Sequence, residues 1–87
     1  MELKILFTKT AFKNYKKIPL RYKILIDREL DKLKKNEKTD IKSVKGQKNI
    51  YRLRVGNYRV LYEIIKPDLI IVNIDVRGNI YKNWFLL

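Results

Sequence analysis

Apolar and polar residues alternate through the second half of this 87-residue chain. Tyr51–Val55 and Tyr58–Ile65 flank Gly56-Asn57, a two-residue link suited to a hairpin turn that needs positive φ. Lys66-Pro67-Asp68 turns the chain again before Leu69–Val76, which is rich in β-branched residues. Because a period of two residues belongs to strands and not to helices, this half is predicted to form consecutive antiparallel strands with one apolar face.

The first half combines a strand pattern with two helical patterns. Residues 2–7 alternate and predict a half-buried strand. Thr8 or Thr10 can cap a short helix, which Ile18-Pro19 ends because the residue before proline avoids the helical region. From Leu20 to about Lys35 the apolar residues follow helical spacing, which predicts an amphipathic helix with a basic outer face. The residues expected on its buried side are Tyr22, Leu25, Ile26, Leu30 and Leu33.

The order of these elements defines the expected fold. Residues 36–48 are polar and read as a loop, and residues 80–85 are expected to form a last strand. A chain this short has room for one core, so residues 1–87 are taken as a single domain. The expected fold class is α+β, in the order β-α-α-β-β-β with a possible further strand: two N-terminal helices packed on one face of a small, mostly antiparallel sheet.

Charge and composition limit the function. Twenty-one Lys and Arg against nine Asp and Glu leave a net charge of +12, which indicates a polyanionic partner such as nucleic acid, or an acidic protein. The absence of Cys and His excludes thiolate zinc sites, Cys nucleophiles and a histidine base, and no metal or cofactor is expected. No apolar run approaches the roughly 20 residues that span a bilayer, and no export signal is visible. We therefore expect a cytoplasmic protein without a membrane partner.

The arginines concentrate in the predicted sheet. A two-residue turn at 56–57 places Arg54 directly opposite Arg59, and Arg52 opposite Leu61, on the polar face. Like charges that face each other destabilise a hairpin, so something other than stability is expected to maintain the pair. A charged face can also be no more than the solvent side of a sheet. In a chain of this charge, a phosphate or RNA site is the favoured interpretation, because guanidinium holds phosphate through two parallel hydrogen bonds.

The next strand is expected to complete both faces of the sheet. With a three-residue turn at 66–68, Arg59 would lie opposite Asp75. Asn73 and Arg77 would then join the arginines on the polar face. The residues expected on the apolar face of this strand are Ile70, Val72, Ile74 and Val76.

The segment YRLRVGNYRVLYE at 51–63 closely resembles the signature strands of the RelE/ParE toxin superfamily, and of its RelE branch in particular. Lys45-Gly46 upstream and IDVRGNIY at 74–81 downstream extend the resemblance. The resemblance implies the toxin of a type II toxin–antitoxin pair, an endoribonuclease that enters the A site of the 30S ribosomal subunit and cuts mRNA. It implies attack by a ribose 2′-OH without metal, neutralisation by a RelB-type antitoxin, and contact with operator DNA only through the antitoxin complex.

The same resemblance implies roles for individual residues. Arg59 and Arg77 match the family's phosphate-binding and leaving-group arginines, and Tyr81 its closing tyrosine, which can stack on a base or orient the nucleotide. Arg52 and Arg54 fall where many relatives have Lys; because Arg is almost never neutral, we interpret both as phosphate clamps. The general base stays unassigned, with Glu63 and Asp75 as candidates. The residues expected to hold RNA are Lys45, Arg52, Arg54, Lys32 and Lys35.

Simpler roles and other functions remain open for these residues. Tyr81 can be a packed strand aromatic, Asp75 can serve only to neutralise a neighbouring Arg, and the helix lysines can form a solvated face. Two other functions compete with RNA cleavage. One is a ParE-like toxin of the same fold that inhibits DNA gyrase and cuts no RNA. The other is a non-catalytic nucleic-acid-binding module.

Overall fold

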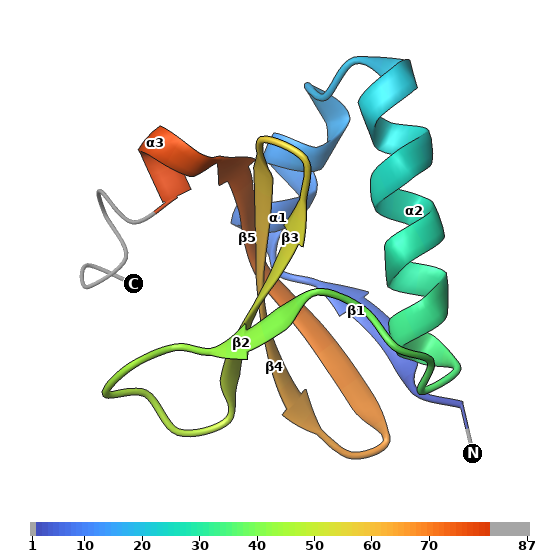
Figure 1. Cartoon of the computed structure of the whole chain (residues 1–87), viewed down its shortest axis with the longest axis vertical. Coiled ribbons are helices and arrows are strands. Elements are labelled where there is room, and N and C mark those ends of the chain that lie inside the picture. Colours follow the sequence, from blue (N-terminus) through green and yellow to red (C-terminus); the bar gives the residue numbers. More distant parts are fainter. Residues whose placement is uncertain (1, 81–87) are drawn as a thin grey trace.

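The computed structural model describes residues 2–80, which form a five-stranded sheet with two helices on one face (Figure 1). The elements in chain order are β1 (Lys4–Phe7), α1 (Lys9–Lys16), α2 (Leu20–Lys34), β2 (Ile41–Ser43), β3 (Ile50–Val55), β4 (Tyr58–Ile65), β5 (Asp68–Val76) and α3 (Arg77–Ile80). The strands lie in the order β1-β5-β4-β3-β2; β1 and β5 are parallel and all other neighbours are antiparallel. The predicted α+β class with a mostly antiparallel sheet is confirmed. In Figure 1, α2 stands to the right of the sheet and α3 to its left.

Thr8, and not Thr10, caps the first helix. Its hydroxyl oxygen accepts a hydrogen bond from the Ala11 N–H at 3.1 Å, as an N-cap residue does. The same hydroxyl donates to the Val72 carbonyl of β5 at 3.1 Å. One side chain therefore begins α1 and also ties it to the strand beneath.

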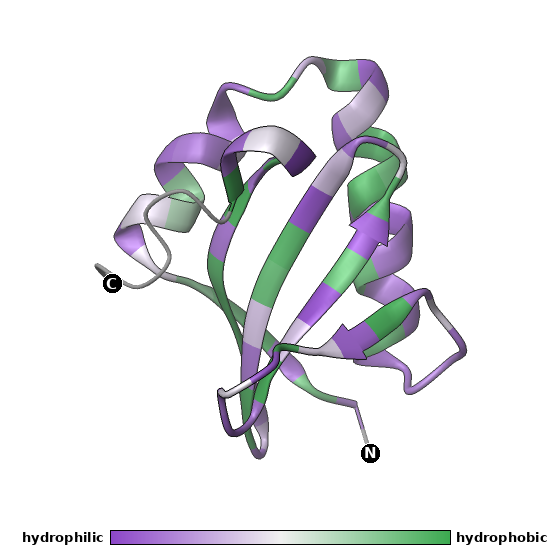
Figure 2. Ribbon diagram, turned by 60° about the vertical axis from the view of Figure 1, so that its left-hand side comes forward, coloured by the Kyte–Doolittle hydropathy of each residue, from purple (hydrophilic) through white to green (hydrophobic). Residues whose placement is uncertain are grey.

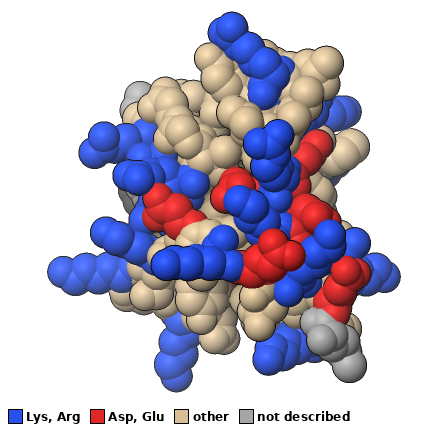
Figure 3. All heavy atoms as spheres, turned by 45° about the vertical axis from the view of Figure 1, so that its right-hand side comes forward, with Lys and Arg blue, Asp and Glu red and all other residues tan. Residues whose placement is uncertain are grey.

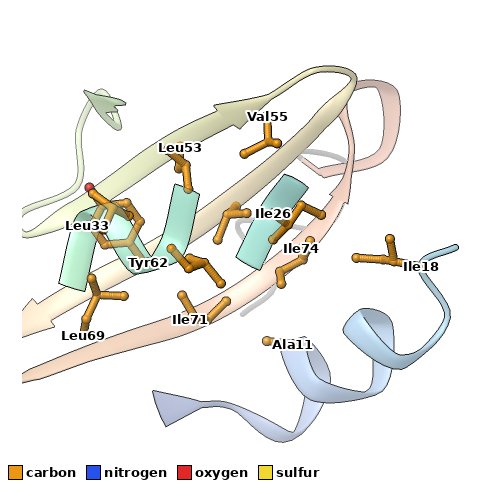
Figure 4. Packing of buried hydrophobic residues seen from close by; sticks show 12 residues of the cluster. Ala11, Ile18, Ile26, Leu33, Leu53, Val55, Tyr62, Leu69, Ile71 and Ile74 are labelled. Carbon is orange, nitrogen blue, oxygen red and sulfur yellow. The ribbon is translucent and has the colours of Figure 1, made fainter. Parts of the chain in front are cut away.

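The hydrophobic core lies between the two long helices and the sheet (Figure 4). Ile26, Leu30 and Leu33 of α2 are buried against strand residues such as Leu53 and Tyr62. Burial, and to a lesser extent the neighbouring Tyr51, raises the pKa of Tyr62 to about 12, so its hydroxyl stays neutral. Figure 2 shows the matching alternation of hydrophobic and hydrophilic residues along the strands.

The buried side of α2 is narrower than its sequence predicts. Leu25 and Tyr22, both expected in the core, are 44% and 37% exposed. Leu25 lies about 100° around the helix from Ile26, which takes it off the buried stripe. Tyr22 lies at the border of that stripe, with its ring 5.5 Å from that of Tyr58.

No helix in the described part of the chain is long and apolar enough to cross a membrane.

The β3–β4 hairpin has the predicted register. Arg54 pairs with Arg59 and Arg52 with Leu61. Gly56 has a φ of +58°, whereas Asn57 is not among the described residues with positive φ. Positive φ at only the first central position is the pattern of a type II′ turn, where glycine is favoured.

The predicted set of inward-facing residues in β5 is partly wrong, because the strand follows a shorter turn and contains a β-bulge. The turn after β4 has two residues and not three, since Ile65 pairs with Asp68. A register shift between Leu61 and Tyr62 then leaves Val72 as an extra residue on β5. Ile70 and Val72 were both predicted to lie on the apolar face. Ile70 instead pairs with Glu63 on the opposite face, and Val72 has no partner on β4. The residues of β5 buried in the core are Leu69, Ile71 and Ile74.

The same bulge explains why the far half of β5 agrees with the prediction. The shorter turn removes one residue from the connection, and the bulge restores it. Arg59 therefore lies opposite Asp75, as expected from a three-residue turn. The shorter turn and the bulge therefore have opposite effects on the register, and the pairing near Arg59 is the predicted one.

Two expected elements differ from the structure. The predicted loop at 36–48 contains β2, an edge strand of three exposed residues. Because all three are exposed, no alternation of burial marks them as a strand. At the C-terminus, Ile80 ends α3 and does not begin a strand; residues 81–85 of the predicted last strand lie outside the described residues.

Replacing Thr8 by Ala should lower the free energy of unfolding by about 1–2 kcal/mol, because it removes an N-cap and leaves the Val72 carbonyl without that donor. Thr10→Ala is the matched control, since Thr10 is exposed and lies inside α1. Urea unfolding of both variants measures the difference. Equal stability of the two would contradict the assignment of the cap.

Candidate nucleic-acid interface

We call the side of the sheet turned away from α1 and α2 the arginine face; it carries Arg52, Arg54 and Arg59. Between these positions, Leu53 and Val60 point into the core. Strand alternation therefore places the three arginines together on the opposite side. The sequence-predicted grouping of these three residues agrees with the structure.

Arg59 is the most buried charged residue of the described chain, with 8% of its surface exposed. Its Nη1 donates to the carbonyls of Gly56 at 2.8 Å and Tyr58 at 3.0 Å. The guanidinium is thus held at the hairpin turn. A cation fixed in this way can stabilise a phosphate without first having to reorganise.

Arg54, across the hairpin, is held by an aspartate that the sequence did not single out. Its Nε lies 2.7 Å from Oδ2 of Asp40, and the Arg54 N–H donates to the Asp40 carbonyl at 2.9 Å. The Arg54 side chain is 57% exposed. It therefore pairs with an internal carboxylate and still faces solvent.

Strand β2 also brings Lys42 to the arginine face. Lys42 pairs directly with Arg52 across β2 and β3, and residues directly opposite one another share a face. Lys45 is exposed in the loop that joins these two strands. Lys42 and Asp40 were missed because no residue pattern separates a three-residue edge strand from the polar loop around it.

Arg77 lies at the same end of the sheet as Arg59. It is exposed and begins α3, and its N–H donates to the Asn57 carbonyl in the β3–β4 turn at 2.8 Å. The structure therefore brings the start of α3 to the turn that also anchors Arg59. Tyr81 lies outside the described residues, and its role stays a prediction.

The two carboxylates proposed as a base differ in position. Asp75 pairs directly with Arg59, and its Oδ1 accepts the Val76 N–H at 2.7 Å. Glu63 lies four residues further along β4, about 13 Å from Arg59 along the strand. Asn73, expected beside the arginines, instead binds Asn14 of α1 at 2.9 Å. Asp75 is therefore the candidate nearer to the charged end.

Lys32 and Lys35, expected to hold RNA, are not part of the arginine face. Lys32 lies on α2 and Lys35 directly follows its end, on the other side of the sheet, and they pair with Glu29 and Asp31, respectively, at 3.0 Å each. Figure 3, turned toward this side, shows basic side chains projecting around the molecule with carboxylates among them. Any RNA contact made by these lysines would be separate from the arginines.

A groove in the described chain lies away from the arginine face. It measures about 1190 Å³ and lies between the start of β1, the end of α2 and the β4–β5 turn. Its lining residues are Glu2, Leu3, Lys35, Asn36, Ile64, Lys66 and Pro67. A nucleic acid bound by the arginines would therefore not occupy this groove.

Comparison with known proteins identifies the family. Residues 5–81 match the sequence model of the family described as the ParE toxin of the type II toxin-antitoxin system parDE. Toxin RelE3 of Methanocaldococcus jannaschii is 38% identical over 84 residues, which cover 91% of this chain and 96% of that protein. The chain belongs to the RelE/ParE family of type II toxins.

Solved structures agree with this assignment. The toxin of the RelB–RelE antitoxin–toxin complex from Methanococcus jannaschii is similar to this chain, with a TM-score of 0.75, 32% identity and coverage of 88% and 95% of the two chains. The archaeal RelE–RelB complex from Pyrococcus horikoshii gives a TM-score of 0.73 at 24% identity, over 91% and 99%. The second match supports the fold alone, whereas the first joins fold and sequence. The predicted resemblance to RelE toxins is confirmed.

Arg59 should also contribute to stability, unlike the other arginines of this face. Arg59→Met should lower the free energy of unfolding by about 2 kcal/mol, since it leaves the carbonyls of Gly56 and Tyr58 without a charged donor. Arg52→Met, which is not buried, is the matched control and should change it by less than about 0.5 kcal/mol. Urea unfolding distinguishes them, and similar losses would contradict a special structural role for Arg59.

Proposed function

We propose that this toxin is a ribosome-dependent endoribonuclease that cleaves mRNA in the A site. The observation that carries the proposal is the direct cross-strand pairing of Arg54 with Arg59 on the arginine face of a chain of net charge +12. Two arginines at facing positions destabilise a hairpin but suit a phosphate that gains negative charge during a reaction. The identity to an archaeal RelE toxin supports the same function.

In the proposed reaction a ribose 2′-oxygen attacks the adjacent phosphorus. The new O–P bond forms as the bond to the 5′-oxygen breaks, which leaves a cyclic phosphate and a 5′-OH. The 2′-OH proton passes to a base, and the departing 5′-oxygen receives a proton. Arg54 and Arg59 would stabilise the phosphorane charge, with Arg52 and Lys42 holding neighbouring phosphates. Asp75 is the nearer candidate for the base, and Arg77 would assist the leaving group.

A cytoplasmic location and an antitoxin partner follow from this proposal. The toxin chains in the two archaeal complexes are bound to RelB antitoxins, and we propose an equivalent partner here, with operator contact made through the complex. The outer surface of the helices suits such a partner because it exposes Phe12, Leu20, Ile24 and Leu25 by 49%, 71%, 50% and 44%. Arg21 lies among them with its guanidinium carbon 4.7 Å from the Tyr22 ring centre. An acidic amphipathic segment would match both features.

The cleavage proposal is tested by mapping mRNA 5′ ends after purified toxin is added to programmed ribosomes. New 5′-OH ends should appear inside the A-site codon, and only with ribosomes present. Arg54→Ala should lower the cleavage rate by about 10²–10³, the usual cost of one lost charge-stabilising donor. Lys66→Ala is the matched control, because Lys66 is an exposed cation in the β4–β5 turn at the other end of the sheet.

Intact mRNA would overturn the cleavage proposal. The second candidate, a gyrase inhibitor, would then be tested by DNA supercoiling, and it is kept because the matching family model is that of ParE toxins. Binding of RNA without cleavage or gyrase inhibition would leave a non-catalytic binding module.

The antitoxin surface is tested with the antitoxin encoded beside this toxin. Leu20→Glu combined with Ile24→Glu should weaken the complex by at least about tenfold, because it places carboxylates on an apolar surface that an acidic segment would cover. Ile41→Glu combined with Ile65→Glu is the matched control, since it adds the same charge at two strand residues that are 42% and 54% exposed. Calorimetric titration measures the affinities, and equal affinities for the two variants would exclude this surface.

A further inference from the structure

Four charged residues form one row across the arginine face. The carbonyl and the carboxylate of Asp40 both bind Arg54. Arg54 lies directly opposite Arg59 across β3 and β4, and Arg59 lies directly opposite Asp75 across β4 and β5. The row thus runs from carboxylate through two guanidiniums to carboxylate. Arg54 therefore has a carboxylate in contact with it, and Arg59 has a carboxylate-bearing residue at the facing position of β5.

The contact at the Asp40 end of the row is short and solvent-accessible. The Arg54 Nε lies 2.7 Å from the Asp40 carboxylate, with side-chain exposures of 57% and 44%. Exposed ion pairs are weak, so a phosphate can compete with the carboxylate for the same guanidinium. The backbone hydrogen bond from Arg54 to Asp40 keeps the carboxylate close whenever a phosphate is absent.

We propose that Asp40 is an internal competitor for phosphate at Arg54, and that it lowers the affinity of the arginine face for free RNA. A chain of net charge +12 attracts any RNA through its phosphates, whatever its sequence. A carboxylate at Arg54 weakens this general attraction at the site of the proposed chemistry. RNA then binds there well only when further contacts, such as those on a ribosome, compensate for displacing Asp40. The inference rests on the proposed function only in taking an RNA phosphate as the ligand.

The test compares Asp40→Asn with Asp31→Asn. Each variant removes one negative charge and one exposed ion pair, but Asp31 lies on α2 and pairs with Lys35. The affinity of each variant for a short, fluorescently labelled single-stranded RNA is measured by anisotropy at several salt concentrations. This measurement needs neither ribosomes nor cleavage, so failure of the proposed function leaves it interpretable.

Asp40→Asn should bind the RNA about fivefold more tightly than Asp31→Asn, the factor expected when a competing exposed ion pair is lost. Its plot of log affinity against log salt should be steeper by about 0.7, because one further phosphate contact forms on a single strand. Adding Arg54→Ala to each of these variants should abolish the difference between them.

Three results would overturn the proposal. Equal affinities of Asp40→Asn and Asp31→Asn would mean that only net charge matters. Weaker binding by Asp40→Asn would mean that Asp40 positions Arg54 for phosphate and does not compete with it. A difference that persists after Arg54→Ala would mean that Asp40 acts on another group.

Discussion

The register of the β3–β4 hairpin is the constraint on which the rest of this structure depends. Because Gly56-Asn57 closes the hairpin with two residues, Val55 pairs with Tyr58, and each further pair follows in order. A slip of one residue would exchange the faces of one strand and turn its arginines toward the helices. The turn therefore determines which side chains α2 can bury and, by the same geometry, which guanidiniums oppose each other.

The two helices α1 and α2 pack on one face of the sheet, so the main core and the arginine face lie on opposite sides. The helices and the inward side chains of the strands form a single core, so the opposite face can carry charges without desolvating most of them. Arg59 is the exception, and the carbonyls of the turn satisfy its buried guanidinium. The neighbouring Arg54 stays exposed beside Asp40. A pair of like charges that would weaken an isolated hairpin is thus bracketed by carboxylates.

Most of the site could be predicted from the sequence because it depends on local rules. A two-residue turn and strand alternation were enough to oppose Arg54 to Arg59. The role of β2 could not be predicted, since an exposed strand of three residues has no pattern of its own and forms only by pairing with β3. Lys42 and Asp40 were missed for that reason. The RNA contact predicted for Lys32 stays a prediction, and this residue lies on α2, away from the arginine face.

By itself, the sequence determined the order of the main elements, the α+β class and the family, because periodicity, turn residues and motif are local properties of the chain. Tertiary structure alone decided the bulge in β5, the narrow buried stripe of α2 and the carboxylate beside Arg54. Each of these depends on which backbone groups meet across the sheet or beneath a helix. Ile70 illustrates the difference: alternation placed it in the core, but its pairing with Glu63, set by the shorter turn, put it on the other face.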